Sequence, residues 1–280
     1  MKVAITGSHG LIGSALAASL RSAGHDTVAV DRSQPIALGG IDAVVNLAGE
    51  PIGAKRWDAE QKRKILTSRR DLTARVAEAV VRDGVPVLLS GSAIGFYGDR
   101  GDDVLTEESP AGEGFLPEVV LAWEAAAQPA VDAGVRVAFL RSGIVQSPAG
   151  GALAKQLPLF KLGLGGRMGS GRQWQSWISI DDEVRAIEHL LVADVRGPVN
   201  LTAPNPVTQG EFAKTLGRVL RRPTFLPTPS FGPKLLLGSE LADVLLHQSQ
   251  RVLPTVLPAT GFEFRHPTLE DALRSVLGRS

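Results

Sequence analysis

"VAITGSHGLIGSAL", residues 3–16, decides the fold because it joins two kinds of hydrophobic pattern through a glycine-rich turn. Val3–Thr6 is a short, continuous apolar run, which is typical of a buried strand. Leu11–Ala23 has helical periodicity, and Gly24 follows it as a signal for the end of a helix. The stretch is therefore predicted to form a strand, a tight turn and a helix.

The glycines of this turn, Gly7, Gly10 and Gly13, have the spacing of a dinucleotide-binding turn. The first permits the tight turn, the second lets the backbone approach a pyrophosphate, and the third allows the helix to pack closely on the strand. Backbone N–H groups where the helix opens, at Leu11 and Ile12, and the positive end of the helix dipole favour an anion. We therefore predict that these residues bind a dinucleotide.

Two charged residues follow the second predicted strand, and they favour different dinucleotides. Asp31 comes 18 positions after Gly13, where a carboxylate accepts hydrogen bonds from ribose hydroxyls and favours NAD. Arg32 is next, and a guanidinium there favours the 2′-phosphate of NADP. In a third interpretation, one of the two is only a solvated loop charge. The local chemistry leaves this choice open.

Strand and helix patterns alternate through the first two-thirds of the chain. Further strands are predicted at Thr27–Val30, Asp42–Leu47, Val85–Leu89 and Val135–Leu140, with helices at Asp58–Arg82 and Pro117–Ala133. Near-continuous apolar strands separated by helices indicate a parallel sheet with helices on both faces. Residues 31–42 have room for a short strand at Pro35–Leu38, but not for a full crossover helix as well. The predicted fold class is α/β, a Rossmann-type doubly wound parallel sheet.

Gly and Pro become more frequent after about Gly143, which indicates a second, smaller unit. We predict a dinucleotide-binding Rossmann domain over residues 1–150 and a small C-terminal substrate domain over residues 151–174 and 201–280. Residues 175–200 are predicted to rejoin the main sheet, because residues 177–192 return to a strand–helix pattern. The stretch PTFLPTPSFGP, residues 223–233, breaks the pattern again.

The composition argues against several classes of function. The 280 residues have a net charge of +1, so no global field recruits nucleic acid or an anionic membrane. Cysteine is absent and the five histidines are scattered, so no metal site is predicted. No apolar stretch reaches membrane-spanning length, and the N-terminus does not have the pattern of a signal peptide. We expect a cytoplasmic protein that acts on a small molecule, and the oligomeric state is left open.

Several longer motifs extend over nearly the whole chain: NLAGEPI, KRWDAEQKRKILTSRR, SGSAIGFYG, AWEAAA, LRSGIV, LPLFKLGLGGRMGSGRQWQSWISIDD and QRVLPTVLPATGFEFRHPTLEDALR. With T-G-x-x-G-x-x-G, they resemble the epimerase-like branch of the extended short-chain dehydrogenase/reductase superfamily, whose members are often labelled sugar-nucleotide epimerase or cell-division-inhibitor-like. The resemblance implies NADP(H) as the usual cofactor, with Arg32 as a 2′-phosphate contact. Most relatives have an uncharged residue before that arginine, so Asp31 keeps NAD as the alternative.

The resemblance also implies cofactor contacts from Leu47, Ala48 and Gly49 in NLAG, from Arg69 in TSRR and from Val145 in SGIV. Arg69 can be argued independently, because it shares a helical stripe with Ile65, Leu72 and Val76. An arginine on such a stripe must snorkel, pair with a buried carboxylate or meet an anion such as a cofactor phosphate. We favour the phosphate.

The resemblance implies a catalytic Ser together with a Tyr-x-x-x-Lys pair for proton transfer. Ser92 matches the family's serine. Tyr97 is the only tyrosine, and Gly101, not a lysine, lies four residues after it. On the helix that should carry the pair, Leu116 and Val120 stand at the expected positions. The standard pair is therefore absent.

Ser92 and Tyr97 remain as candidate catalytic residues, the first to orient a substrate oxygen and the second to donate a proton. In the alternative interpretation, Ser92 caps the strand end and Tyr97 is a buried ring with a satisfied hydroxyl. Glu118 and the loop Gly163–Trp177 also lie near the expected crevice. The arginine and tryptophan side chains of this loop either clamp a ligand or pack at a domain interface.

The leading hypothesis is an NAD(P)-dependent oxidoreductase or epimerase-like enzyme that acts on a small substrate through non-standard proton transfer. The alternative is an NADP(H)-binding sensor or regulatory protein with little turnover, and the missing tyrosine–lysine pair motivates it.

Overall fold

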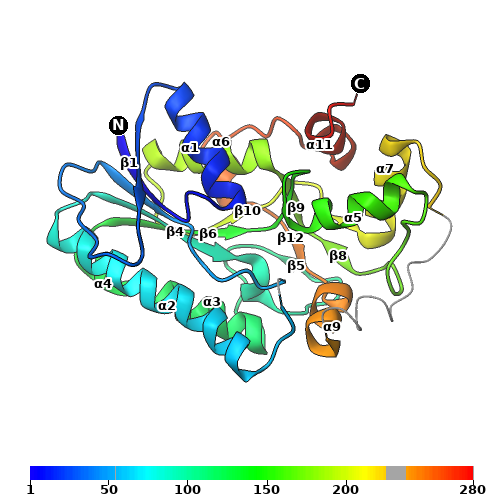
Figure 1. The fold of residues 1–280 in the computed structure, drawn as a ribbon, viewed down its shortest axis with the longest axis horizontal. Helices are drawn as coiled ribbons and strands as arrows, with labels where there is room; N and C mark the ends of the chain where they lie inside the picture. Colours follow the sequence, from blue (N-terminus) through cyan, green and yellow to red (C-terminus); the bar gives the residue numbers. More distant parts are fainter. Residues whose placement is uncertain (54, 225–237, 280) are drawn as a thin grey trace.

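A six-stranded parallel sheet, ordered β10-β6-β4-β3-β1-β2, forms the centre of the protein (Figure 1). The computed structural model describes residues 1–53, 55–224 and 238–279. The sheet strands are β1 (Lys2–Thr6), β2 (Asp26–Val30), β3 (Ala43–Asn46), β4 (Val87–Ala93), β6 (Arg136–Ser142) and β10 (Gly197–Leu201). The predicted α/β class with a Rossmann-type parallel sheet is confirmed.

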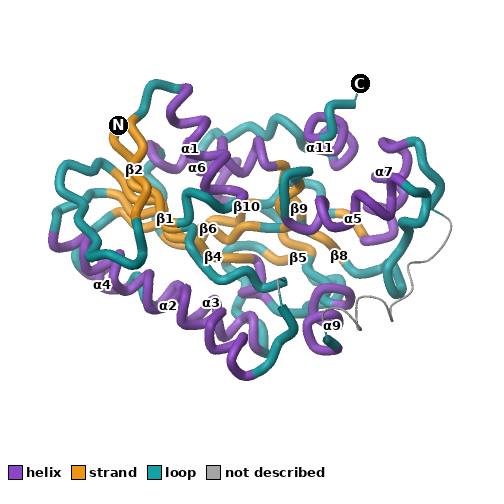
Figure 2. Tube along the Cα trace, in the orientation of Figure 1, coloured by secondary structure: helices purple, strands orange, loops and turns teal. Residues whose placement is uncertain are grey.

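Helices cover both faces of the sheet, as Figures 1 and 2 show. On one face lie α1 (Leu11–Ser22) and α6 (Ile180–Val192), and on the other lie α2 (Ala59–Arg82), α3 (Phe115–Ala125) and α4 (Gln128–Asp132). Each face has its own apolar core because successive strand residues point to opposite sides. In β1, Val3 and Ile5 join the α1–α6 core, whereas Ala4 joins the α2–α4 core.

Two local predictions differ from the structure. The helix predicted at Pro117–Ala133 is divided into α3 and α4, because Pro129 lacks an amide hydrogen and cannot continue the hydrogen-bond ladder. Residues Pro35–Leu38 do not form the short strand that was predicted. Their chain is held instead by the buried side chain of Leu38 and by its N–H, which donates to the Asp83 carboxylate at 2.7 Å. As predicted, residues 31–42, all of which the structure describes, form no crossover helix between β2 and β3.

Residues 175–200, which were predicted to rejoin the main sheet, do so only at their end, in β10. The strand Trp177–Ser179 (β9) pairs with β7 (Ile144–Gln146) and not with the main sheet. Trp177 lies in β9, and its ring is buried with Leu153 and Phe212 in an apolar core separate from those of the main sheet. The main sheet is rejoined by β10, which pairs with β6.

The other described elements surround the carboxyl ends of the sheet strands or pack beside α6. They are η1 (Ile94–Tyr97), β5 (Val104–Leu105), α5 (Gly151–Lys161), β8 (Trp174–Gln175), β11 (Val207–Thr208), α7 (Gln209–Leu220), α9 (Ser239–His247), β12 (Arg251–Val252), α10 (Val256–Ala259) and α11 (Leu269–Val276). The predicted break at residues 223–233 lies mostly outside the described residues. None of the helices that the structure describes is long and apolar enough to cross a membrane.

Candidate functional site: a glycine-only turn and a buried polar network

The turn between β1 and α1 accepts only glycine at its critical positions. Gly7 has a φ of +67°, and a Cβ on it would lie 2.9 Å from the Ala48 nitrogen. A Cβ on Gly13 would lie 2.2 Å from the Gly7 carbonyl oxygen, far inside van der Waals contact. Gly10 precedes α1, whose first amides, starting at Leu11, have no intrahelical acceptor. The turn therefore fits a pyrophosphate, with backbone donors at a helix N-terminus.

Thr6 ties the glycine turn to the segment after β3. Its hydroxyl donates to Asn46 Oδ1 at 2.7 Å and accepts from the backbone N–H groups of Leu47 and Ala48 at 3.0 and 3.2 Å. Asn46 Nδ2 in turn donates to Thr73 Oγ1 of α2 at 2.8 Å. Sequence reasoning missed Thr6 and Asn46. A polar residue at the end of each apolar strand was the signal that could have found them.

Val145, the most distant predicted cofactor contact in the sequence, lies near the turn. A Cβ on Gly150 would lie 3.3 Å from Leu11 Cδ1, and a Cβ on Gly151 would lie 3.6 Å from the Val145 carbonyl oxygen. Ile12 and Val145 pack against the same apolar core. The structure thus brings the segment between β7 and α5 beside the first turn of α1.

Asp31 and Arg32 differ in how firmly the protein holds them. The Asp31 carboxylate accepts from the N–H of Ser33 at 2.8 Å and from its hydroxyl at 2.7 Å, and these hydrogen bonds lower the pKa of Asp31. The Arg32 side chain is exposed and lines a pocket with Thr67, Ser68, Asp71, Leu72 and Arg75. Arg75 fixes this loop by donating to the carbonyl oxygens of Arg32 and Gln34, both at 2.8 Å.

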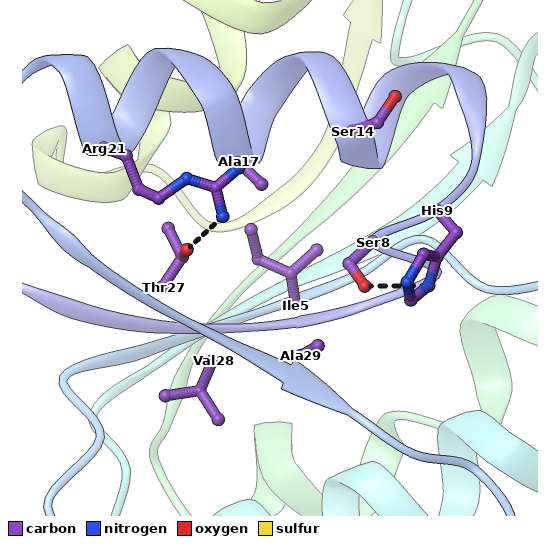
Figure 3. A pocket seen from close by; sticks show the side chains of 9 residues that line it. All are labelled: Ile5, Ser8, His9, Ser14, Ala17, Arg21, Thr27, Val28 and Ala29. Atoms are coloured by element: carbon purple, nitrogen blue, oxygen red, sulfur yellow. Dashed lines mark hydrogen bonds between the residues drawn. The ribbon is translucent and has the colours of Figure 1, made fainter.

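A second pocket lies beside the turn, between α1 and β2 (Figure 3). Ser8 and His9 line one end of it, where the Ser8 hydroxyl lies 3.4 Å from His9 Nδ1. Arg21 lines it from α1 and donates to Thr27 Oγ1 at 3.3 Å. Neither Ser8 nor His9 was predicted as a site residue, although both stand between the first two glycines.

Arg69 is largely buried in α2 and forms no ion pair with the residues that the structure describes. Its Nη1 donates to the carbonyl oxygens of Glu50 and Ile65 at 2.9 and 3.1 Å, and its guanidinium lies 5.1 Å from the Trp123 ring centroid. Burial lowers the pKa of Arg69 to about 10. A Cβ on Gly49 would lie 3.0 Å from Arg69 Cζ, so this glycine makes room for the guanidinium. The group remains a buried cation that an anion would stabilise.

Ser92 and Tyr97 belong to one buried polar network. Ser92 Oγ donates to Glu124 Oε1 at 2.6 Å, and Arg141 donates to both oxygens of Glu124 at 2.9 Å. Arg141 also donates to the Tyr97 hydroxyl at 3.1 Å, and that hydroxyl donates to Asn200 Oδ1 at 2.7 Å. Glu124, Arg141 and Asn200 were not predicted as site residues. The motifs AWEAAA and LRSGIV contain the first two, and these motifs were the available signal.

Tyr97 is fully buried, with an exposed fraction of 0%. Burial raises the pKa of its phenol above the ordinary value, although the hydrogen bond from Arg141 acts in the opposite direction. Leu116 and Val120 stand where a tyrosine and a lysine were expected, and both face Gly95, since its Cβ would lie 3.6 and 3.9 Å from them. This geometry favours the interpretation of Tyr97 as a packed ring with satisfied hydrogen bonds.

The two tryptophans of the loop Gly163–Trp177 lie in different surroundings. Trp177 is fully buried, and its Nε1 donates to the Asn205 carbonyl oxygen at 3.0 Å. Trp174 Nε1 donates to Asp102 Oδ1 at 2.8 Å, and the Arg251 guanidinium stacks 4.5 Å from its ring centroid. Trp177 is therefore packed inside the protein, as in the interface interpretation. Trp174 is only half-buried, and for it the clamp interpretation stays a prediction.

The doubly wound sheet and the glycine-rich turn between β1 and α1 define a Rossmann-type dinucleotide-binding protein. The chain belongs to the NAD-dependent epimerase/dehydratase family, whose model matches residues 3–201. A second model, a domain of unknown function called DUF1731, matches residues 228–276. These matches confirm the predicted family resemblance.

Individual relatives match nearly the whole chain. Epimerase family protein MT2273 of Mycobacterium tuberculosis is 44% identical over 97% of this chain and 96% of its own length. The structure of human epimerase family protein SDR39U1 (isoform 2), solved with NADPH, has a TM-score of 0.93 and 34% identity and covers 99% of both chains. A nucleoside-diphosphate sugar epimerase from Corynebacterium glutamicum has a TM-score of 0.80 and 38% identity, over 99% of this chain and 58% of its own.

Proposed function

We propose that this protein binds NADP(H) and uses it as an oxidoreductase or epimerase-like enzyme on a small-molecule substrate. The observation that carries the proposal is the turn in which a Cβ on Gly13 would lie 2.2 Å from the Gly7 carbonyl oxygen. Such close packing keeps the first amides of α1 available for a pyrophosphate. The NADPH in the structure of the human relative supports this assignment.

Within the proposed site, Arg32 selects NADP over NAD. Asp31 accepts two hydrogen bonds from Ser33 in its own turn, both at Oδ1, which engages one of its two oxygens before a ribose hydroxyl binds. Arg32 is exposed in a pocket whose other walls include Arg75, so two guanidinium groups lie near the position proposed for a 2′-phosphate. Guanidinium groups bind phosphates through paired, charge-assisted hydrogen bonds. NAD remains the alternative cofactor.

Cofactor titrations of the purified protein test this proposal. We expect Arg32→Ala to weaken NADPH binding by about 10- to 100-fold, the range for loss of a charge-assisted hydrogen bond, and to change NADH binding by less than about twofold. Arg279→Ala, which removes an exposed arginine at the end of the chain, is the matched control and should change neither affinity. Equal effects of Arg32→Ala on both cofactors would contradict the 2′-phosphate assignment.

Arg69, Leu47, Ala48, Gly49 and Val145 complete the proposed cofactor site. The segment of Leu47 and Ala48 is held by the Thr6 hydroxyl at the end of β1. Arg69 is a largely buried cation that forms no ion pair with the described residues, although the Glu50 carboxylate acts on it at longer range, and such a cation would be stabilised by an anionic ligand. The division into a Rossmann domain and a C-terminal substrate domain also remains a proposal, supported by the separate apolar core around Trp177. A cytoplasmic location stays a prediction.

The chemical step is proposed to use Ser92 without the tyrosine–lysine pair. Aliphatic Leu116 and Val120 at that pair's positions also support the second candidate function, a NADP(H)-binding sensor with little turnover. Consumption of NADPH, followed by its absorbance across a panel of carbonyl compounds, separates the two. Turnover with any compound supports the enzyme, whereas tight cofactor binding without turnover across the panel supports the sensor.

A further inference from the structure

We propose that Ser92 presents a hydrogen-bond acceptor, not a donor, to the substrate, so that the group bound there is an O–H or N–H group. The inference rests on the proposed function in one respect, since it takes Ser92 to face the substrate beside the cofactor. It deepens that function by naming the chemical class that the site selects: an alcohol or amine in preference to the matching carbonyl compound.

The only hydrogen on the Ser92 hydroxyl is already directed at a carboxylate. Ser92 Oγ donates to Glu124 Oε1 at 2.6 Å, in the range of short hydrogen bonds to charged acceptors. Among the described residues, none donates a hydrogen bond to Ser92 Oγ. Ser92 is 5% exposed, and its lone pairs accept no hydrogen bond from the described residues, whereas its hydrogen is engaged.

Arg141 keeps Glu124 as a carboxylate, which is the form that accepts the hydrogen of the Ser92 hydroxyl. Its Nε and Nη2 each donate to one oxygen of Glu124 at 2.9 Å, which is the bidentate geometry of an ionised carboxylate. The side chains of Glu124 and Arg141 have exposed fractions of only 13% and 5%, so solvent screens this pair weakly. An ionised carboxylate has no hydrogen to donate, and Ser92 is therefore the donor of the pair.

Several elements fix Arg141 in this position. Ser92 and Arg141 are register partners on the neighbouring parallel strands β4 and β6. The Arg141 guanidinium stacks 3.5 Å from the centroid of the Phe96 ring, and its Nη1 donates to the Tyr97 hydroxyl. If the Ser92 hydroxyl rotated toward a ligand carbonyl, its hydrogen bond to Glu124 would break. The rotation would provide Glu124 with no other donor in its place. Glu124 and Arg141 are therefore positioning residues for Ser92.

Two probes of similar shape test the proposal, both in the presence of NADP⁺ so that neither can react. 1-Methylcyclohexanol is a tertiary alcohol that cannot be oxidised to a ketone, and cyclohexanone cannot be reduced by an oxidised cofactor. We expect the alcohol to bind about 10- to 100-fold more tightly in NMR titrations, because the ketone must displace a charge-assisted hydrogen bond. Ser92→Ala should bring the ratio close to 1, and Ser92→Thr, which keeps the hydroxyl, should preserve it.

Glu124→Gln examines the positioning role, since a neutral amide holds the Ser92 hydrogen less firmly and should lower the alcohol preference. A tighter or equal affinity for the ketone in the wild-type protein, a preference that survives in Ser92→Ala, or no binding of either probe would overturn the proposal. Because Glu124→Gln removes a partner of the buried Arg141, its melting temperature is measured beside the wild type. If it does not fold, the Ser92 variants decide the outcome.

Neutron diffraction from cofactor-free, deuterium-exchanged crystals gives a readout that does not depend on the proposed function. We expect the deuteron on Ser92 Oγ to point toward Glu124 Oε1. A deuteron directed away from Glu124 would overturn the inference even if NADPH binds. A protein that fails to bind NADP(H), by contrast, refutes the proposed function in the cofactor titration and leaves the deuteron position to be read separately.

Discussion

Glu183 shows how burial can change the chemistry of one residue outside the proposed site. It lies in the first turn of α6 with an exposed fraction of 0%, and Ser142 Oγ donates to its Oε1 at 2.5 Å. Its other oxygen, Oε2, has no hydrogen-bond partner among the described residues. Burial raises the pKa of this carboxyl to about 8, although the bond from Ser142 acts in the opposite direction. Glu183 is therefore mostly protonated at neutral pH.

This residue should make the stability of the protein depend on pH. The folded-state pKa of about 8 lies above the ordinary value of 4.5, so the folded state binds more protons between these values. The free energy of unfolding should then fall as pH rises from about 5 to 8. We expect Glu183→Gln, which cannot ionise, to flatten this dependence and to be more stable than the wild type at pH 8 by roughly 3 to 5 kcal/mol.

Urea unfolding at pH 5, 6, 7 and 8 measures the effect, with Glu78→Gln on the exposed face of α2 as the matched control. The control should follow the wild-type pH dependence. Parallel curves for the wild type and Glu183→Gln would show that the carboxyl ionises normally in the folded state.

Arg69 illustrates what a helical pattern reveals about one residue and what it leaves open. Its place on a stripe with Ile65 and Val76 predicted a poorly hydrated guanidinium, and the side chain is indeed largely buried. The pattern could not identify the groups around it, because Gly49 and Trp123 come from other elements. Periodicity along one helix determines which face is buried, but not what packs against that face.

At the scale of elements, the β1–turn–α1 unit is the part of the protein whose geometry follows most directly from its sequence. Its constraints are short-range: Gly7 needs a positive φ, and Gly13 must lie against the Gly7 carbonyl oxygen. The division between α3 and α4 is also local in origin, since Pro129 interrupts the ladder, and attention to that proline would have placed the boundary. By contrast, the side-by-side pairing of β9 with β7 depends on the burial of Trp177.

We expect Gly13→Ala to distort this unit and to weaken NADPH binding by at least about 10-fold, because the new Cβ would lie 2.2 Å from the Gly7 oxygen. The change should also lower stability by about 1 to 3 kcal/mol, the usual range for overpacking. Gly39→Ala is the matched control, since a Cβ there meets no atom within 4 Å. Calorimetric titration with NADPH checks the prediction, and unchanged affinity for Gly13→Ala would contradict it.

At the scale of the whole molecule, the parallel sheet brings the residues of the proposed site together from distant parts of the chain. The turn after β1, the charged pair after β2, the Thr6-bound segment after β3, Ser92 at the end of β4 and Val145 after β6 all follow carboxyl ends of sheet strands. In a doubly wound sheet these ends meet at one edge, where ligands bind. A buried link continues to the C-terminal part, since Glu107 accepts from the backbone of Asn200 and from the Thr255 hydroxyl.

A cofactor that contacts all of these segments should stabilise the protein as one unit. At a free NADPH concentration 100 times the dissociation constant, the expected gain is about 2.7 kcal/mol, which corresponds to a rise in melting temperature of roughly 5 to 10 °C for a chain of this size. Thermal scans with NADPH, NADH and no cofactor measure it. No shift at saturating NADPH would contradict the proposed site, and an equal shift with both cofactors would contradict the preference for NADP.

The sequence by itself determined the α/β class, the glycine turn and the absence of the tyrosine–lysine pair, because each depends on residue types or on spacing within a short stretch. Only the tertiary structure decided the partners of Ser92 and Tyr97, since Glu124, Arg141 and Asn200 come from α3, β6 and β10. Hydrogen-bond direction and burial are set by atoms that meet across elements. A pattern along one segment of the chain shows which residue types are present there, whereas tertiary packing decides which atoms they contact.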